Sequence, residues 1–206
     1  MSRDRLIAGP RARFPEVWGR GGAPEAVLGS GPRGRMPVTL VPVSDAHVEA
    51  VAALLDDPDV QRFTPLPVPA PDDYPSRWIA GYVAARAEGT REMFAIVGED
   101  RGGEFLGLAM APRIEREKRT VELGYVVAPE WRGRGVAAQA LSTMTTWAFE
   151  TQDALRIELR IGVDNLASKA VAGRCGYLRE GTLRGLHFRG EMRADTEVWA
   201  RLCGED

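Results

Sequence analysis

Residues 120–137 constrain the fold more than any other stretch, because they read as a buried strand, a turn and the start of a helix. Pro129 ends the strand, since proline cannot donate to a sheet ladder. From Val136 onward, apolar residues recur at helical spacing. The strand prediction rests on a nearly continuous run of β-forming side chains, Val121, Leu123, Tyr125, Val126 and Val127.

The turn before the helix has the sequence Arg132-Gly133-Arg134-Gly135-Val136-Ala137. The first amides of a helix lack internal partners and carry partial positive charge, and glycine lets a ligand approach the backbone. Two arginines add formal charge, so the pattern favours a phosphate or pyrophosphate site. The alternative is an ordinary strand-to-helix turn with solvated arginines, because a short glycine motif alone is weak evidence.

The rest of the chain predicts an α/β fold. Short turns between residues 92 and 127 imply an antiparallel meander, whereas the helix between the strands at 120–127 and 157–163 requires those two to be parallel. We predict one domain over 37–203, with a mixed sheet of six to seven strands, antiparallel at both ends and parallel at the centre, flanked by about four helices. The other expected strands are 38–43, 92–97, 105–112, 177–182 and 196–202, with irregular chain at 62–71 and 184–195.

Composition excludes several classes of function. A net charge of −2 argues against general nucleic-acid binding. No run is long and apolar enough to span a membrane, and Cys175 and Cys203 form no disulfide framework, so a cytoplasmic location is expected. The two histidines, His47 and His187, lie far apart without cysteine or carboxylate spacing around them, so no metal site is expected.

Residues 1–36 are rich in arginine, glycine and proline and show no sustained apolar period. We therefore predict a disordered extension. A basic tail of this kind suits an acidic partner or nucleic acid. We favour the alternative that it is an upstream extension of the reading frame, because Met36 directly precedes the first predicted strand.

The turn resembles the pyrophosphate loop of the GNAT superfamily, the acyl-coenzyme-A-dependent N-acyltransferases. The pattern of that loop is Arg or Gln, two residues, Gly, any residue, then Gly or Ala, and Arg132, Gly135 and Ala137 fill it. The likeness continues through residues 122–125 and 175–181 and covers most of 38–202. It looks most like the branch of ribosomal-protein N-terminal (alanine or serine) acetyltransferases.

The resemblance implies a GNAT fold and transfer of an acetyl group from acetyl-coenzyme A to a primary amine, by direct attack in a ternary complex and without a metal. It implies a monomer or a homodimer. The pyrophosphate is expected on the backbone amides of the turn, and the pantetheine arm along the end of the preceding strand. The cofactor-binding residues it assigns are Val126, Val127, Ala128, Arg132, Gly133, Arg134, Gly135, Val136, Ala137, Asn165 and Ser168.

Acyl transfer between a thioester and an amine requires proximity, removal of a proton from the amine and stabilisation of the oxyanion. Glu122 is the candidate base, because it lies on a strand with apolar neighbours and shares a side with Gly124 and Val126. The alternative is a strand carboxylate paired to an arginine across the sheet.

The acid that protonates the leaving thiolate is a harder question. Many GNAT members place a tyrosine in the helix after the asparagine position, and here that place is Ala172. By likeness to the branch, Ser168 is the candidate, although serine in a first helical turn is commonly a local cap. Tyr177 and solvent are the other possibilities.

The acceptor is expected between the stretch 62–82 and the excursion 184–195, because specificity resides on such irregular segments. Trp78, Tyr82, His187 and Phe188 offer a flat apolar lining, although the first two are also typical of core positions. A protein N-terminal amine, an aminoglycoside, a polyamine and an amino acid all remain open. Acids that could hold an ammonium group are Asp72, Asp73, Glu191 and Asp195.

Two other classes compete with the acetyltransferase interpretation. Residues 133–138 also satisfy the G-x-G-x-x-A dinucleotide fingerprint, but the turn follows an antiparallel meander instead of beginning a parallel series. A non-catalytic module that senses acyl-coenzyme A is the other class, because fold does not guarantee activity.

Overall fold

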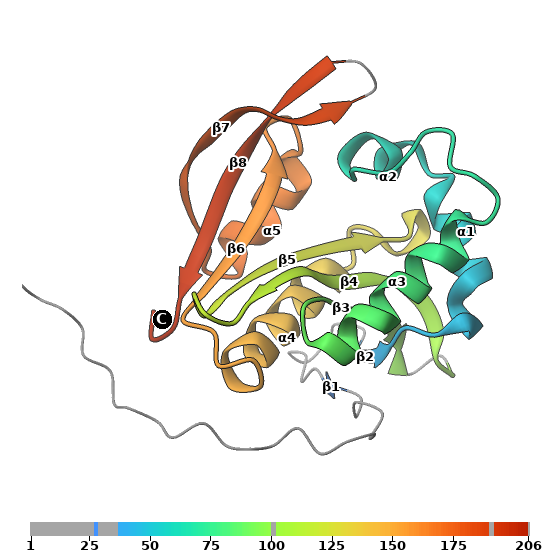
Figure 1. Cartoon of the computed structure of the whole chain (residues 1–206), viewed down its shortest axis with the longest axis horizontal. Coiled ribbons are helices and arrows are strands. Elements are labelled where there is room, and N and C mark those ends of the chain that lie inside the picture. Colours follow the sequence, from blue (N-terminus) through green and yellow to red (C-terminus); the bar gives the residue numbers. More distant parts are fainter. Residues whose placement is uncertain (1–26, 29–36, 100–101, 190–191, 206) are drawn as a thin grey trace, which may run out of the picture.

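The structure is a computed structural model, and it describes residues 27–28, 37–99, 102–189 and 192–205. Its centre is one sheet with the strand order β1-β2-β3-β4-β5-β6-β8-β7 (Figure 1). Every neighbouring pair is antiparallel except β5 and β6, so the predicted mixed sheet with a parallel centre is confirmed. The strands are β1 (Val27–Leu28), β2 (Val38–Pro42), β3 (Glu92–Gly98), β4 (Glu104–Glu115), β5 (Thr120–Val127), β6 (Arg156–Gly162), β7 (Leu178–Arg189) and β8 (Met192–Leu202).

The eighth strand of the sheet is β1, which the sequence did not predict. Val27 and Leu28 pair with Leu40 and Thr39 of β2, within the segment expected to lack structure. The rest of residues 1–36 lies outside the described residues. Two consecutive apolar residues are too short a signal to identify a strand from periodicity.

Two layers of helices cover the sheet (Figure 1). α4 and α5 pack together on one face, while α1 and α3 pack on the other, where α3 contacts β3. The side chains of β5 follow this division, since Val121 and Leu123 are buried in the core and the alternate Glu122 is only partly covered. The helices are α1 (Val48–Leu55), α2 (Pro58–Phe63), α3 (Tyr74–Glu88), α4 (Val136–Glu150) and α5 (Leu166–Arg174).

α2 is the helix that sequence reasoning missed. The Asp57-Pro58 pair indicates the end of α1, but it also begins α2. Asp57 Oδ1 accepts a hydrogen bond from the Val60 amide at 3.0 Å, and Pro58 occupies the first turn, where its missing N–H costs nothing. The irregular chain predicted from residue 62 therefore starts after Phe63.

The predicted excursion at 184–195 is also wrong. β7 continues to Arg189 and β8 begins at Met192, so the two strands form one long hairpin (Figure 1). The ladder is irregular between Leu183 and His187, and this bulge interrupts the alternation that would have identified a continuous strand.

β5 and β6 diverge after a short parallel ladder. Their pairing runs from Thr120↔Arg156 to Leu123↔Leu159 and then stops, although β5 continues to Val127 and β6 to Gly162. Figure 1 shows the two strands separating from that point. The sheet is thus open at its centre, between the far halves of β5 and β6. Within the described part of the chain, no helix has the length and apolarity needed to cross a membrane.

Candidate active site

A single cleft of about 620 Å³ occupies the opening between β5 and β6. One end is lined by the glycine-rich turn and the start of α4, the middle by the diverging strands and α5, and the other end by α2, α3 and the β7–β8 hairpin. The cleft therefore joins the predicted anion site to the predicted acceptor region in one continuous space.

The wall formed by β5 offers backbone groups to the cleft. Val126 and Val127 pair with Leu108 and Gly107 of β4 on one side, and their other side faces the divergence from β6. Both residues line the cleft. Ala128 is not among the cleft-lining residues; its amide donates to the Leu106 carbonyl at 2.9 Å and its carbonyl accepts from the Trp131 amide at 2.9 Å. Both backbone groups of Ala128 are thus already hydrogen-bonded within the protein, and its place in cofactor binding stays a prediction.

The glycine-rich turn has the geometry of an anion site. Gly133 and Gly135 have φ values of +74° and +83°, which residues with a side chain rarely adopt. The first helical hydrogen bond runs from the Gln139 amide to the Gly135 carbonyl at 3.1 Å, so the amides at 136–138 precede the helical ladder. Gly133, Gly135, Val136 and Ala137 all line the cleft.

The two arginines of the turn have other partners. The Arg132 guanidinium donates to Asp57 Oδ1 at 2.5 Å, to Asp59 Oδ2 at 3.1 Å and to the Val127 carbonyl at 3.0 Å. It thereby ties α2 to the turn. The Arg134 guanidinium lies 4.8 Å from the centroid of the Trp131 ring. Only Arg132 lines the cleft, so the expectation that both guanidinium groups flank a phosphate does not match the described arrangement.

The pKa of Asp57 is lowered where the glycine-rich turn contacts α2. Burial acts to raise the pKa of its carboxyl, but the hydrogen bonds from Arg132 and from the Val60 amide outweigh burial and hold the pKa below its usual value. The aspartate is therefore an anion at neutral pH, and it binds Arg132 and caps α2 with the same oxygen.

Asn165, the N-cap of α5, and Ser168 in its first turn both line the cleft, and their contact with the cofactor stays a prediction. The Asn165 Oδ1 atom accepts a hydrogen bond from the Ser168 amide at 3.0 Å, so the asparagine caps the helix. Tyr125, a cleft residue that sequence reasoning did not single out, donates its hydroxyl to the Ser168 carbonyl at 3.3 Å. Burial raises the pKa of Tyr125 to about 12. The sequence did hold a signal for Tyr125: it lies two residues after Leu123 on the same strand, so both side chains point to the helix layer of α4 and α5.

Tyr177 is not placed for proton transfer in the cleft. Its side chain is 2% exposed, and its hydroxyl lies 2.7 Å from Thr145 Oγ1 on α4. Desolvation by burial raises its pKa. The residue belongs to the core, because its apolar ring packs there while Thr145 satisfies the hydroxyl. The suggestion that it could act as the acid is therefore wrong.

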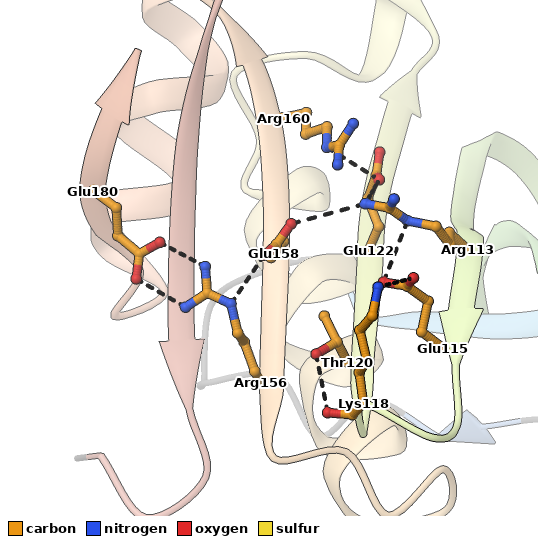
Figure 2. Close-up of polar contacts among 9 residues, drawn as sticks. All are labelled: Arg113, Glu115, Lys118, Thr120, Glu122, Arg156, Glu158, Arg160 and Glu180. Carbon is orange, nitrogen blue, oxygen red and sulfur yellow. Dashed lines mark hydrogen bonds and ion pairs between the residues drawn. The ribbon is translucent and has the colours of Figure 1, made fainter. Parts of the chain in front are cut away.

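Glu122 lies in a row of charges that crosses the sheet on the face opposite α4 (Figure 2). Its Oε2 atom is 2.9 Å from Arg113 Nη2 and 3.2 Å from Arg160 Nε, and its side chain is 18% exposed. The Glu122 carboxylate is therefore flanked by two guanidinium groups in place of the apolar environment expected for a catalytic base. The arginine-paired alternative matches the structure, because strand neighbours on both sides supply guanidinium groups.

The row continues from Glu122 to the edge of the sheet. Arg113 Nη2 is 3.9 Å from Glu158 Oε2, Arg156 Nε is 2.9 Å from Glu158 Oε1, and Arg156 also contacts Glu180. Figure 2 shows these side chains lying on one face across β4, β5, β6 and β7. We call this set the ionic row, defined by Arg113, Glu122, Arg160, Glu158, Arg156 and Glu180.

The acceptor end of the cleft carries the predicted aromatic residues. Trp78, Tyr82, His187 and Phe188 all line it. Tyr82 is also buried in the core, and its ring lies 6.1 Å from that of Trp78. Desolvation by burial raises the pKa of Tyr82 to about 12.

The acids proposed to hold an ammonium group have other contacts. Asp73 pairs with Arg77 at 3.0 Å, and Asp195 accepts from the Gly185 amide at 2.8 Å. Asp72 is exposed and Glu191 lies outside the described residues. Among the residues that the structure describes, no group of three or more His, Cys, Asp or Glu side chains is arranged to hold a metal ion.

Comparison with known proteins gives one consistent answer. Residues 38–178 match the family described as acetyltransferase (GNAT) domain. The ribosomal-protein-serine acetyltransferase of Escherichia coli is 31% identical over 124 residues, which cover 60% of this chain and 68% of that protein. The spermidine N(1)-acetyltransferase of Vibrio cholerae is 28% identical over 87 residues, covering 42% of this chain and 50% of that protein.

The solved structures agree on the fold. A ribosomal L7/L12 α-N-protein acetyltransferase, RimL, in complex with coenzyme A superposes with a TM-score of 0.78 at 22% identity, covering 88% of this chain and all of that one (100%). RimJ of Mycobacterium smegmatis superposes with a TM-score of 0.76 at 24% identity, covering 82% and 84% of the two chains. The expected fold is thereby confirmed.

Proposed function

This chain belongs to the GNAT acetyltransferase family, and on that premise we propose that it transfers an acetyl group from acetyl-coenzyme A to a primary amine. The observation that carries the proposal is the single cleft, which connects a helix-terminal turn with two positive-φ glycines to the gap between diverging strands and then to an aromatic pocket. A cosubstrate with a pyrophosphate, an extended arm and a reactive end requires these three parts in this order.

The residues present fit such a cosubstrate. The amides at 133–138 suit the pyrophosphate, because an unsatisfied helix start and glycine backbone attract phosphate oxygens. The arm lies between β5 and β6, where Val126 and Val127 supply peptide groups. The dinucleotide alternative lacks support, because the turn follows an antiparallel meander and α4 leads to a strand that pairs with β5 only briefly.

Direct attack of the amine on the thioester requires no enzyme nucleophile. Backbone amides at the end of β5 stabilise the oxyanion, and the cleft holds the two reactants together. Ser168 protonates the leaving thiolate in this proposal, because it is a cleft-lining residue that carries a hydroxyl. We assign Glu122 a structural role in place of the catalytic role first expected, because its carboxylate is ion-paired to both Arg113 and Arg160.

The acceptor we propose is the α-amine at the N-terminus of a polypeptide. The name of the Escherichia coli relative supports this class, and so does the open, aromatic-lined end of the cleft between α3 and the β7–β8 hairpin. The Vibrio cholerae relative acts on spermidine by its name, which keeps a small polyamine as the competing acceptor.

A thiol-release assay with acetyl-coenzyme A distinguishes the acceptors. Peptides that begin with serine or alanine, the same peptides with a blocked N-terminus, and spermidine are supplied in parallel. Turnover of the free peptides but not of the blocked ones supports the polypeptide acceptor. Turnover of spermidine with all peptides inert contradicts that acceptor and leaves acetyl transfer standing.

A non-catalytic acyl-coenzyme-A-binding module is the second candidate. It is favoured by Ala172, which is fully buried (0% exposed) at the place where many family members have a tyrosine. Tight binding of acetyl-coenzyme A, measured by thermal shift, with no thiol release across the whole amine panel would establish this candidate instead.

A further inference from the structure

His187 occupies an unusual position for a strand residue of an exposed hairpin. It lies on β7, lines the cleft, and its Nδ1 atom is 2.8 Å from Thr196 Oγ1 of β8. Thr196 is 1% exposed and pairs with Gly162, the last residue of β6. The histidine is therefore anchored beside the point where β6 has separated from β5, at the reactive end of the cleft.

A bulge in β7 sets this position. Leu183 pairs with Thr196, and the next registered pair is His187 with Ala194, so four steps along β7 match two along β8. A regular ladder would place Gly185 opposite Ala194. Bulges re-aim side chains next to functional sites, and here the bulge brings an imidazole to the cleft in place of a hydrogen atom.

Specific contacts hold the bulge. Gly185 has a φ of +59°, its amide donates to Asp195 Oδ1 at 2.8 Å, and its carbonyl accepts from Arg193 Nη1 at 2.8 Å. A Cβ atom at Gly185 would lie 3.1 Å from Arg193 Cδ. These contacts fix the backbone of the bulge and therefore the direction in which the His187 side chain leaves β7. A strand with only a structural role would not need them.

The orientation determines which nitrogen faces the reactants. When Nδ1–H donates to the threonine oxygen, the lone pair is on Nε2, the far side of the ring. Imidazole is the side chain that gains and loses a proton near neutrality, as a general base must. Glu122, by contrast, already shares Oε2 between Arg113 and Arg160.

We propose that His187, oriented by Thr196, is the general base that removes a proton from the attacking amine. Nε2 takes the proton as the nitrogen–carbon bond forms, the carbon–sulfur bond then breaks with its electron pair on sulfur, and the thiolate is protonated from the cleft. The role rests on the proposed acetyl transfer. Thr196 is a positioning residue. The other titratable or charged groups that line the cleft are Asp59 and Arg62 (α2), Tyr74 and Tyr82 (α3), Glu122 and Tyr125 (β5), Arg132 (turn before α4), Arg160 (β6) and Arg174 (α5).

The test is the pH dependence of kcat/KM for acetyl-coenzyme A and the best amine of the panel. His187→Gln is expected to lower kcat by roughly 100-fold or more and to remove the ascending limb of the pH profile, with the Kd for coenzyme A changed less than about twofold. Added imidazole is expected to restore part of the activity of His187→Ala. His47→Gln, a change at the other histidine, on the remote 3-10 turn Asp45–His47, should leave the profile unaltered.

Thr196→Val gives an independent readout if His187→Gln fails to fold. This variant retains the imidazole but loses the hydrogen-bond partner of Nδ1. We expect kcat to fall by about tenfold and the midpoint of the ascending limb of the pH profile to shift. An active wild type whose His187→Gln or Thr196→Val variant keeps its rate within about threefold and keeps its profile overturns the role of His187 alone. A wild type that binds acetyl-coenzyme A but acetylates no amine overturns the proposed function and this role together.

Discussion

The two ends of the cleft are built differently. The cofactor end consists of backbone: a β5 edge, two positive-φ glycines and the first amides of α4. The acceptor end consists of side chains from α2, α3 and the β7–β8 hairpin. Backbone sites depend on glycine, proline and helix starts, which a sequence displays directly, whereas side-chain sites depend on which distant segments meet.

Arg132 connects the two ends. Its guanidinium belongs to the glycine-rich turn, but it binds Asp57, the residue that caps α2, and Asp59 within that helix. A residue that the family pattern assigns to phosphate binding therefore also fixes a wall of the acceptor region. Substitutions at each end, and at the contact between Arg132 and Asp57, test whether the two ends function independently.

The largest effect is expected at the backbone end. Gly135→Asp should weaken coenzyme A binding by at least about 100-fold, or about 2.8 kcal/mol, because it adds a negative charge and a side chain at a φ of +83°. Isothermal titration calorimetry measures the loss. Gly103→Asp is the matched control, since Gly103 has a φ of +86° in the turn between β3 and β4. Equal affinity in both variants would contradict the placement.

Glu122→Gln should cost about 2 kcal/mol of unfolding free energy, because it leaves Arg113 and Arg160 without their largely buried partner. Urea unfolding measures this. Glu180→Gln, at the 46%-exposed end of the same ionic row, should cost about 0.5 kcal/mol. If Glu122→Gln abolishes turnover while keeping full stability, Glu122 is the base and the structural role is wrong.

Ser168→Ala should lower kcat by about tenfold, or about 1.4 kcal/mol in the barrier, with little change in coenzyme A affinity. Tyr177→Phe should leave kcat unchanged and cost about 1 kcal/mol of stability through the lost contact with Thr145. Single-turnover thiol release measures both rates. An unchanged rate for Ser168→Ala would make solvent the proton source.

The smallest effect concerns the link between the ends. The substitution Asp57→Asn keeps a side chain that can cap α2 but removes the charge, and it should cost about 1 kcal/mol at pH 7. The folded pKa of Asp57 lies below 3.8, so this stabilisation is complete above that value and disappears as the pH falls through the folded pKa. The unfolding free energies of wild type and variant should become equal there. A difference that persists at lower pH would exclude the Arg132 ion pair as its cause.

Sequence reasoning succeeded where the signal was local. The strand at 120–127 and the glycine-rich turn before the helix at Val136 each follow from residues a few positions apart, and the structure places them as expected. It failed at α2, where one Asp-Pro pair ends one helix and begins another. It also failed at the hairpin, where the bulge before His187 breaks the strand alternation.

The ion-pair partners of Glu122 could not be identified from the sequence. Arg113 and Arg160 lie on flanking strands, and a chain with 27 lysines and arginines offers no way to choose them without the register. Strand parity identified the face on which Glu122 lies, but its environment depended on the strands beside it. An assignment of catalytic role from one strand alone was therefore unsafe.

The central claim is that one cleft holds acetyl-coenzyme A between the glycine-rich turn and the diverging strands. Hydrogen–deuterium exchange, measured by mass spectrometry with and without acetyl-coenzyme A, tests it directly. Binding should slow exchange in peptides that cover 124–127 and 132–138, while peptides from 45–55 remain unchanged. Tight binding with no protection at 132–138, or with protection confined to other segments, would contradict the account.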